Sequence, residues 1–197
     1  MKYDEIYKNN DFVWGDSPNK LLEMIADKAD NSAPFLDLGC GQGRDSLFML
    51  KKGFRIVAVD KSQEGLNKIS ETVSTAKLPE DMIELVCGDA KDFSIKANGF
   101  SVINAFNVFQ FMDKADVLAV IENIKKGLIV DGYIVVSGFL SDPDKKTDKG
   151  FFKEGELKNL FSDFASVFYE EKVIDDLGHP GCPNPHQHHV VKMISQK

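Results

Sequence analysis

The stretch Phe35-Leu36-Asp37-Leu38-Gly39-Cys40-Gly41-Gln42-Gly43-Arg44 decides the fold of this chain. Residues 35–38 have strand character and run into three alternate glycines, and a helical apolar pattern then continues as far as Gly53. Glycine tolerates positive φ and lets a ligand approach the backbone, and the amides of such a turn open a helix. The stretch therefore predicts a strand, a turn and a helix that together cradle a nucleotide.

Three details indicate which nucleotide the turn would bind. Gly43 comes one residue earlier than the third glycine of the dinucleotide fingerprint G-x-G-x-x-G, and Arg44 stands where that fingerprint has glycine. The charge of Asp37 would repel a pyrophosphate and attract an ammonium group. Asp60 ends the next strand pattern, 21 residues after Gly39, where a carboxylate can accept hydrogen bonds from both ribose hydroxyls. An adenosine joined to an amino acid meets all three demands.

These residues resemble motif I, D/E-x-G-x-G-x-G, of the class I S-adenosylmethionine (SAM) dependent methyltransferases, and the resemblance covers nearly the whole chain. Within that superfamily, segments 36–47, 53–54 and 59–62 look most like the tellurite-resistance methyltransferase type. The resemblance implies SAM as the cofactor, S-adenosylhomocysteine as its product, and a small methyl acceptor such as a tellurite- or selenite-type oxyanion or a thiol. A glycine turn that merely joins a strand to a helix is the structural alternative.

Alternating strand and helix patterns predict one α/β domain over residues 1–197, with a mostly parallel, Rossmann-like sheet and helices on both faces. In the resembling family this sheet has seven strands in the order 3-2-1-4-5-7-6, and the last two strands are antiparallel to each other. Asp131-Gly132 is expected to turn the chain into the fifth strand. We expect strands near 33–38, 55–60, 82–87, 100–106, 133–137, 165–174 and 188–195, and helices around 47–50, after Ser62, at 113–126 and near 154–162.

Residues 1–30 are expected to form an N-terminal lid or flanking helix region. Ser17-Pro18 can cap a helix with apolar residues at 21, 22, 25 and 29. Trp14, the only tryptophan, would close over the cofactor or simply pack against the sheet edge. Segment 141–150 has no periodicity, which predicts a mobile loop.

Ligands of an open parallel sheet bind outside the carboxyl ends of the strands, at the switch in strand order. Gly88-Asp89-Ala90 resembles the family position that contacts adenine, although Asp89 could instead cap a helix. Asn107 and Val108 match the region along the methionine part of the cofactor. The predicted cofactor-binding residues are Trp14, Asp37, Gly39, Cys40, Gly41, Gly43, Asp60, Lys61, Ser62, Asp89, Ala90, Asn104, Asn107 and Val108.

All four histidines lie between residues 179 and 189. If the last strand runs antiparallel to the others, this segment reaches the edge that carries the glycine turn, and alternation points residues 188 and 189 to opposite faces. We predict a catalytic set that attracts an anionic acceptor: His186, His188, His189 and Arg44. Three alternatives stay open: a structural salt bridge for Arg44, plain loop histidines, and metal ligation by His and Cys, whose spacing matches no recognised pattern, so that no metal is predicted.

Composition narrows the class of protein. The chain has 197 residues, 43% of them hydrophobic, and a net charge of −7, which disfavours a nucleic-acid partner. The absence of an Asn-Pro-Pro-aromatic motif also disfavours amino-methylation of DNA bases. Three widely spaced cysteines, no apolar leader and no run of 18 apolar residues predict a cytoplasmic protein without a membrane partner, as a monomer or homodimer.

The predicted chemistry is direct in-line transfer of the sulfonium methyl, which requires alignment and exclusion of water but no strong general base. Two other classes remain as alternatives. A nucleotide-dependent oxidoreductase is disfavoured by the glycine spacing. A catalytically silent SAM-binding module would bind the cofactor and transfer nothing.

Overall fold

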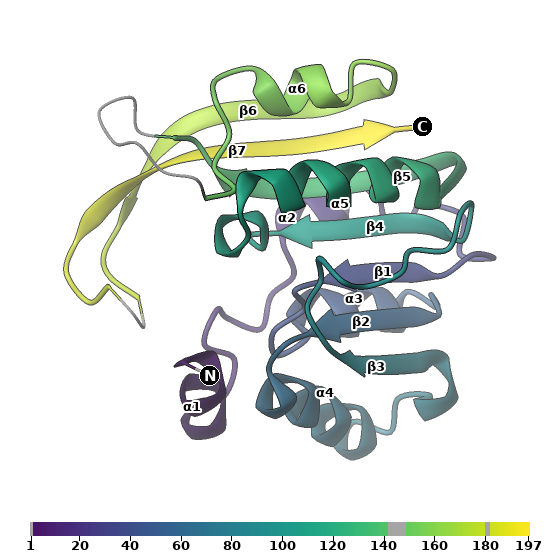
Figure 1. Cartoon of the computed structure of the whole chain (residues 1–197). Coiled ribbons are helices and arrows are strands. Elements are labelled where there is room, and N and C mark those ends of the chain that lie inside the picture. Colours follow the sequence, from purple (N-terminus) through teal and green to yellow (C-terminus); the bar gives the residue numbers. More distant parts are fainter. Residues whose placement is uncertain (1, 142–148, 180–181) are drawn as a thin grey trace.

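The computed structural model of the chain describes residues 2–141, 149–179 and 182–197. Seven strands form one sheet in the order β3-β2-β1-β4-β5-β7-β6, which confirms the predicted topology (Figure 1). Strands β1 to β5 pair in parallel, and β7 is antiparallel to both of its neighbours. The strands are β1 (Phe35–Leu38), β2 (Ile56–Asp60), β3 (Ile83–Cys87), β4 (Phe100–Phe106), β5 (Leu128–Phe139), β6 (Ala165–Asp176) and β7 (His186–Gln196).

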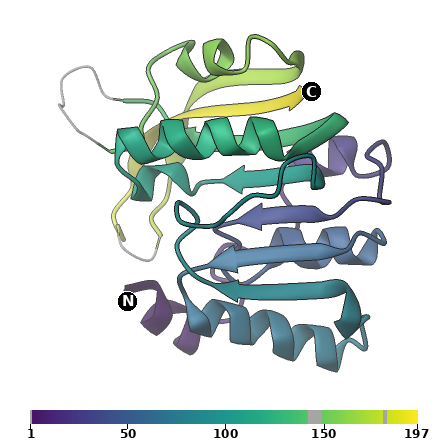
Figure 2. The ribbon, with the colours of Figure 1, turned by 45° about the vertical axis from the view of Figure 1, so that its right-hand side comes forward.

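Helices cover both faces of the sheet, and each face has its own apolar core. One core joins the sheet to α2, α3 and α4, and the other joins it to α5 and α6. Figures 1 and 2 show α5 crossing the front of the sheet while α3 lies behind it. The helices are α1 (Lys2–Asn9), α2 (Lys20–Ile25), α3 (Arg44–Lys51), α4 (Gln63–Thr75), α5 (Lys114–Gly127) and α6 (Glu156–Leu160), with 3-10 turns η1 (Glu80–Met82) and η2 (Phe109–Phe111).

Two local predictions about helix starts have different outcomes. Ser62 caps α4 as expected, because its Oγ accepts a hydrogen bond of 3.1 Å from the amide of Gly65. The cap of α2, in contrast, is Asn19 and not Ser17-Pro18: the Asn19 side chain accepts from the amide of Leu22 at 3.1 Å. The helix therefore starts at Lys20, later than the Ser17-Pro18 signal suggests.

The expected turn at Asp131-Gly132 is wrong, because these residues lie inside β5. Phe100 of β4 pairs with Leu128, but Val102 pairs with Tyr133, so β5 carries extra residues at this point. Asp131 has φ of 61°, the left-handed conformation that an irregular insertion can require. The turn signal thus marks an irregularity within a longer strand.

The N-terminal region divides into two parts with different positions. Helix α2 flanks the sheet, with Leu21, Leu22 and Ile25 buried. Helix α1, which was not predicted from the sequence, lies beside α4 near the carboxyl ends of the strands (Figure 1). The Ser62 hydroxyl holds it there by donating to Asp4 Oδ1 at 2.6 Å.

The predicted loop at 141–150 lies mostly outside the described residues. Among the helices that the structure does describe, none is long and apolar enough to cross a membrane.

Candidate functional site

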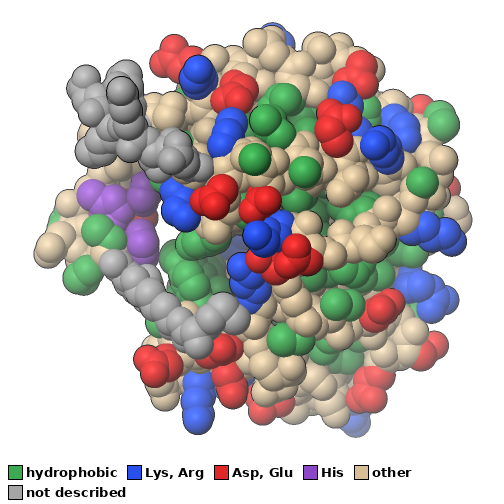
Figure 3. Space-filling view, viewed as in Figure 1, with side chains coloured by type: hydrophobic (Ala, Val, Ile, Leu, Met, Phe, Trp, Pro, Cys, Tyr) green, Lys and Arg blue, Asp and Glu red, His purple; other side chains and the backbone are tan. Residues whose placement is uncertain are grey.

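A cavity of about 730 Å³ opens at the carboxyl ends of the parallel strands, a size typical of small-molecule sites. In Figure 1 these ends point to the left, between α1 below and the tip of the β6–β7 hairpin above. The space-filling view shows the histidine side chains gathered at the same side (Figure 3). The cavity therefore lies where the topology predicts a ligand.

Most of the predicted cofactor-binding residues line this cavity, and Gly43 does not. Gly43 has φ of +78°, and a Cβ there would come within 2.4 Å of Ile69 Cγ1 in α4. A glycine is therefore required at position 43 because the turn packs closely against α4. Gly39, in contrast, lines the cavity as expected, although a Cβ on it would also meet a side chain, Val108 Cγ2 at 2.6 Å. The residues of the predicted set that line the cavity are Trp14, Asp37, Gly39, Cys40, Gly41, Asp60, Lys61, Ser62, Asp89, Ala90, Asn104, Asn107 and Val108.

Asp60 is held rigidly at the end of β2 by two backbone amides. Its Oδ2 accepts from the amide of Gly41 and its Oδ1 from the amide of Ser62, both at 2.8 Å. Burial raises the pKa of Asp60, and these two hydrogen bonds act in the opposite direction. Each oxygen keeps a second lone pair, so the carboxylate is oriented and can still accept from a ligand.

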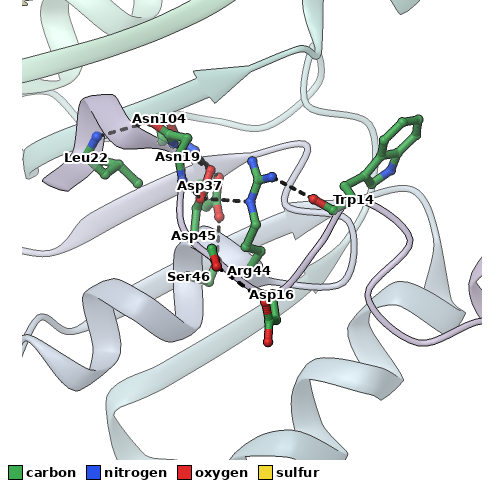
Figure 4. Close-up of polar contacts among 10 residues, drawn as sticks. Trp14, Asp16, Asn19, Leu22, Asp37, Arg44, Asp45, Ser46 and Asn104 are labelled. Atoms are coloured by element: carbon green, nitrogen blue, oxygen red, sulfur yellow. Dashed lines mark hydrogen bonds and ion pairs between the residues drawn. The ribbon is translucent and has the colours of Figure 1, made fainter. Parts of the chain in front are cut away.

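Asp37 sits at the centre of a buried polar network (Figure 4). Its two oxygens accept from Ser46 Oγ at 2.6 Å and Asn104 Nδ2 at 2.8 Å. Burial raises the pKa of Asp37 to about 7, and the charge of Asp45 adds to this rise. Among the described residues, the buried Asn104 Oδ1 has no hydrogen-bond partner. A buried carboxylate beside an unpaired amide oxygen forms a site that would accept a cationic donor such as an ammonium group.

Arg44 lines the cavity but is engaged with its own neighbours (Figure 4). Its Nε lies 3.2 Å from Asp45 Oδ1, and its Nη1 donates to the carbonyl oxygen of Trp14 at 2.9 Å. The structural salt bridge that we considered for Arg44 is present. The same contacts tie residue 14 to the start of α3.

The segment after β3 contributes an acidic residue, as predicted, but this residue is ion-paired. Asp89 Oδ2 lies 2.6 Å from Lys61 Nζ, which joins the ends of β2 and β3. Asp89 Oδ1 accepts from the amide of Lys91 at 3.2 Å. Ala90 is buried next to this pair and lines the cavity.

Aromatic side chains of the N-terminal segment form a wall that sequence reasoning missed. The rings of Tyr3 and Tyr7 of α1 are tilted by 37° with centroids 5.7 Å apart, and Tyr3 meets Phe111 edge to face. Trp14 is 43% exposed, and its Nε1 donates to Tyr7 Oη at 3.4 Å. The i, i+4 spacing of the two tyrosines is the signal that could have indicated this wall.

The opposite rim carries a group that we call the histidine cluster, defined as Asp176, His179, His186 and His188. His186 Nε2 lies 2.8 Å from His188 Nε2, which lies 3.6 Å from Asp176 Oδ2. Burial, together with the neighbouring histidines, lowers the pKa of His188, and Asp176 opposes this. A neutral imidazole here could donate a hydrogen bond but would add little charge.

The structure brings the predicted histidines together only in part. His188 lines the cavity. His186 does not line it, but the His186 ring contacts that of His188 from the same face of β7. His189 is exposed and does not line the cavity. Asp176 and His179 line it although we did not predict them; a carboxylate and a histidine flanking a predicted hairpin were the available signal.

Comparisons with known proteins place this geometry in a family. The family model described as "Tellurite resistance protein TehB" matches residues 22–179. The carboxy-S-adenosyl-L-methionine synthase of Shewanella halifaxensis is 28% identical over 79% of this chain and 60% of its own length. The probable S-adenosyl-L-methionine-dependent methyltransferase TehB of Haemophilus influenzae is 30% identical over 70% of this chain and 48% of its own length.

A crystal structure of TehB from Haemophilus influenzae has the same fold, with a TM-score of 0.77 at 24% identity, over 90% of this chain and 61% of that one. The chain thus spans between about half and about three fifths of the length of these relatives. The family match nevertheless covers most of the chain and includes the glycine turn, Asp60 and the strands up to β6. This chain belongs to the TehB tellurite resistance protein family.

Proposed function

We propose that the protein is a SAM-dependent methyltransferase that acts on a small-molecule acceptor. The observation that carries this proposal is the pair of oriented carboxylates, Asp37 and Asp60, on either side of the glycine turn. The names of the relatives, two of which refer to S-adenosyl-L-methionine, support it. When bound, SAM would supply a methyl group on a positively charged sulfur, which leaves as a neutral thioether.

The cavity offers complementary groups for each part of the cofactor. Asp37 and the unpaired Asn104 Oδ1 would receive the ammonium group, and Asp60 would receive the ribose hydroxyls. Gly39 lines the cavity, where the absence of a side chain would let the cofactor approach the backbone. Asp89, held by Lys61, would accept from the exocyclic amine of adenine.

The remaining end of the cavity would hold the acceptor. It is bounded by Phe139, His188 and Lys192 on the last strands and by Trp14 on the N-terminal segment. His188 could donate a hydrogen bond to an oxyanion or thiolate there, and Arg44, although ion-paired, lies on the same cavity wall. His186 would act through His188, since the two rings are in contact. An anionic or polarizable acceptor needs no strong general base, so the task of the chain is alignment and exclusion of water.

The relatives named as carboxy-SAM synthases favour a second candidate. A chain related to them at 28% identity could modify SAM itself instead of transferring its methyl group. Both candidates require SAM in the same cavity, and they differ in the product. The silent binding module would give no product at all.

Calorimetry with SAM and S-adenosylhomocysteine, followed by an acceptor screen with methyl-labelled SAM, tests the proposal. We expect both nucleotides to bind and the label to appear on at least one anionic acceptor among tellurite, selenite and small thiols. Mass spectrometry of the spent cofactor separates the candidates. S-adenosylhomocysteine indicates methyl transfer, whereas SAM heavier by one carboxyl group, in parallel assays that also contain a carboxylic acid able to donate that group, indicates carboxylation. Binding of NAD without binding of SAM would refute the proposal in favour of an oxidoreductase.

A further inference from the structure

The tip of the β6–β7 hairpin gathers four metal-binding side chains that lie far from the glycine turn in sequence. Asp176 pairs with His186 across the ladder, and His188 stands two residues further along the same face of β7. His179 follows β6, and its backbone pairs with Cys182 through two hydrogen bonds of 2.9 Å. Ligand atoms of the histidine cluster all lie within 4.8 Å of one another.

Two of these side chains are oriented by backbone groups. His186 Nδ1 lies 2.8 Å from the carbonyl oxygen of Asn184, which can only accept, so Nδ1 carries the proton and Nε2 keeps its lone pair. Asp176 Oδ1 accepts from the amide of Gly178 at 2.7 Å, which leaves Oδ2 facing His188. Partners of this kind, outside the ligand shell, typically orient metal ligands.

We propose that Asp176, His179, His186 and His188 bind one divalent transition-metal ion, with Zn²⁺ the best match. Three imidazoles and one carboxylate suit zinc, whereas Mg²⁺ and Ca²⁺ prefer oxygen ligands alone. A tetrahedral zinc ion holds its ligand atoms about 3.3 Å apart. The present separations between His188 Nε2 and its two neighbours, 2.8 and 3.6 Å, lie on either side of that value.

Four protein ligands fill a tetrahedral shell, so the ion would have a structural role. His188 stacks on Phe139 with centroids 4.7 Å apart, and the His179 ring lies 5.6 Å from that of Trp14. Both aromatic residues line the cavity. The ion would therefore fix the hairpin tip as a rim of the cavity. That this rim borders the acceptor rests on the proposed function, but the binding of the ion does not.

Metal titration of the untagged, metal-stripped chain of 197 residues tests this site. Dialysis against Zn²⁺ should leave one ion per chain. Co²⁺ should produce the intense visible absorption of a tetrahedral complex and should quench the emission of Trp14, because that ring is next to His179. Finding less than half an equivalent of tightly held ion, or a weak octahedral Co²⁺ spectrum, would overturn the proposal.

Variants within the β6–β7 hairpin sharpen the test. His186→Gln and Asp176→Asn should each weaken Zn²⁺ binding by at least about 100-fold, since loss of a ligand costs more than loss of an outer partner. His189→Gln is the matched control, because the His189 side chain is exposed and lies outside the cluster. This variant should leave the affinity for Zn²⁺ unchanged. Equal weakening by His189→Gln would contradict the ligand assignment. SAM calorimetry on the same samples keeps the two proposals apart, since either ligand can bind without the other.

Discussion

The glycine turn and the tip of the β6–β7 hairpin border the same cavity, but they are built differently. The turn is held by backbone amides, and its carboxylate Asp37 is only 2% exposed. The tip is held by backbone pairing between β6 and β7 and by contacts within the histidine cluster, and Leu177 beside it is 87% exposed. A buried turn can bind the same cofactor throughout a family. The residues of an exposed tip, in contrast, can be replaced without destabilising the core. The predictions below test this contrast from the largest effect to the smallest.

The largest effect is expected at the glycine that supports the turn. Gly43 and Gly155 both precede a helix at positive φ, but only at Gly43 does an added Cβ meet a buried side chain, Ile69 Cγ1 at 2.4 Å. Gly43→Ala should therefore lower the free energy of unfolding by about 2–4 kcal/mol, and Gly155→Ala by only about 1 kcal/mol. Urea unfolding followed by circular dichroism measures both. Equal losses would show that backbone strain alone accounts for the effect.

Asp60 tests whether the turn binds the ribose. Asp60→Asn removes one charge-assisted acceptor, so the affinity for SAM should fall by roughly 30- to 150-fold, or about 2–3 kcal/mol. Asp175→Asn is the control, because it makes the same change in charge on an exposed carboxylate of β6. Calorimetry with both folded variants gives the comparison. Similar affinities for the two variants would remove Asp60 from the site.

The raised pKa of Asp37 predicts a pH dependence of cofactor binding. Because burial raises this pKa to about 7, the free protein holds the proton on Asp37 at lower pH, and an ammonium group must displace it. The affinity for SAM should therefore rise with pH and fall up to about tenfold for each pH unit below 7. Calorimetry at pH 6, 7 and 8, in buffers that differ in ionisation enthalpy, detects the released proton. A flat profile in the parent protein would mean that Asp37 is already ionised.

Trp14 gives the smallest expected effect and links the two regions. Trp14→Phe keeps an aromatic ring but loses the 3.4 Å contact from Nε1 to Tyr7, so SAM affinity should fall only about 2- to 5-fold. If the N-terminal segment closes over the cofactor, SAM should protect residues 1–16 from proteolysis in both forms. Cleavage at the same rate with and without SAM would mean that the segment does not close and that Trp14 only packs against its neighbours.

The strand positions and the carboxylate positions were predictable because their signals are local, whereas the strand order was expected only from the family resemblance. Parallel strands buried on both faces give continuous apolar runs, such as that of β2, and Asp60 directly ends this run. The cap of α2 was misplaced because Asn19 and Ser17 are both good caps, and Asn19 is selected by its bonds of 2.9 and 2.7 Å to the distant Asp45. The irregularity at Asp131 was read as a turn because both use the same backbone conformation.

The amino-acid sequence by itself determined the glycine turn and the carboxylates beside it, from which we predict the class of ligand. Spacing along one short segment settles these features, whatever the rest of the chain does. Only the tertiary structure decided which residues face the turn across the cavity. The strand order and the register of β6 against β7 bring Asp176 to His186 and place His188 on Phe139. A shift of one residue in that register would turn these side chains to the other face. The sequence therefore predicted histidines at this edge, but it could not tell which of them meet Asp176 in the histidine cluster.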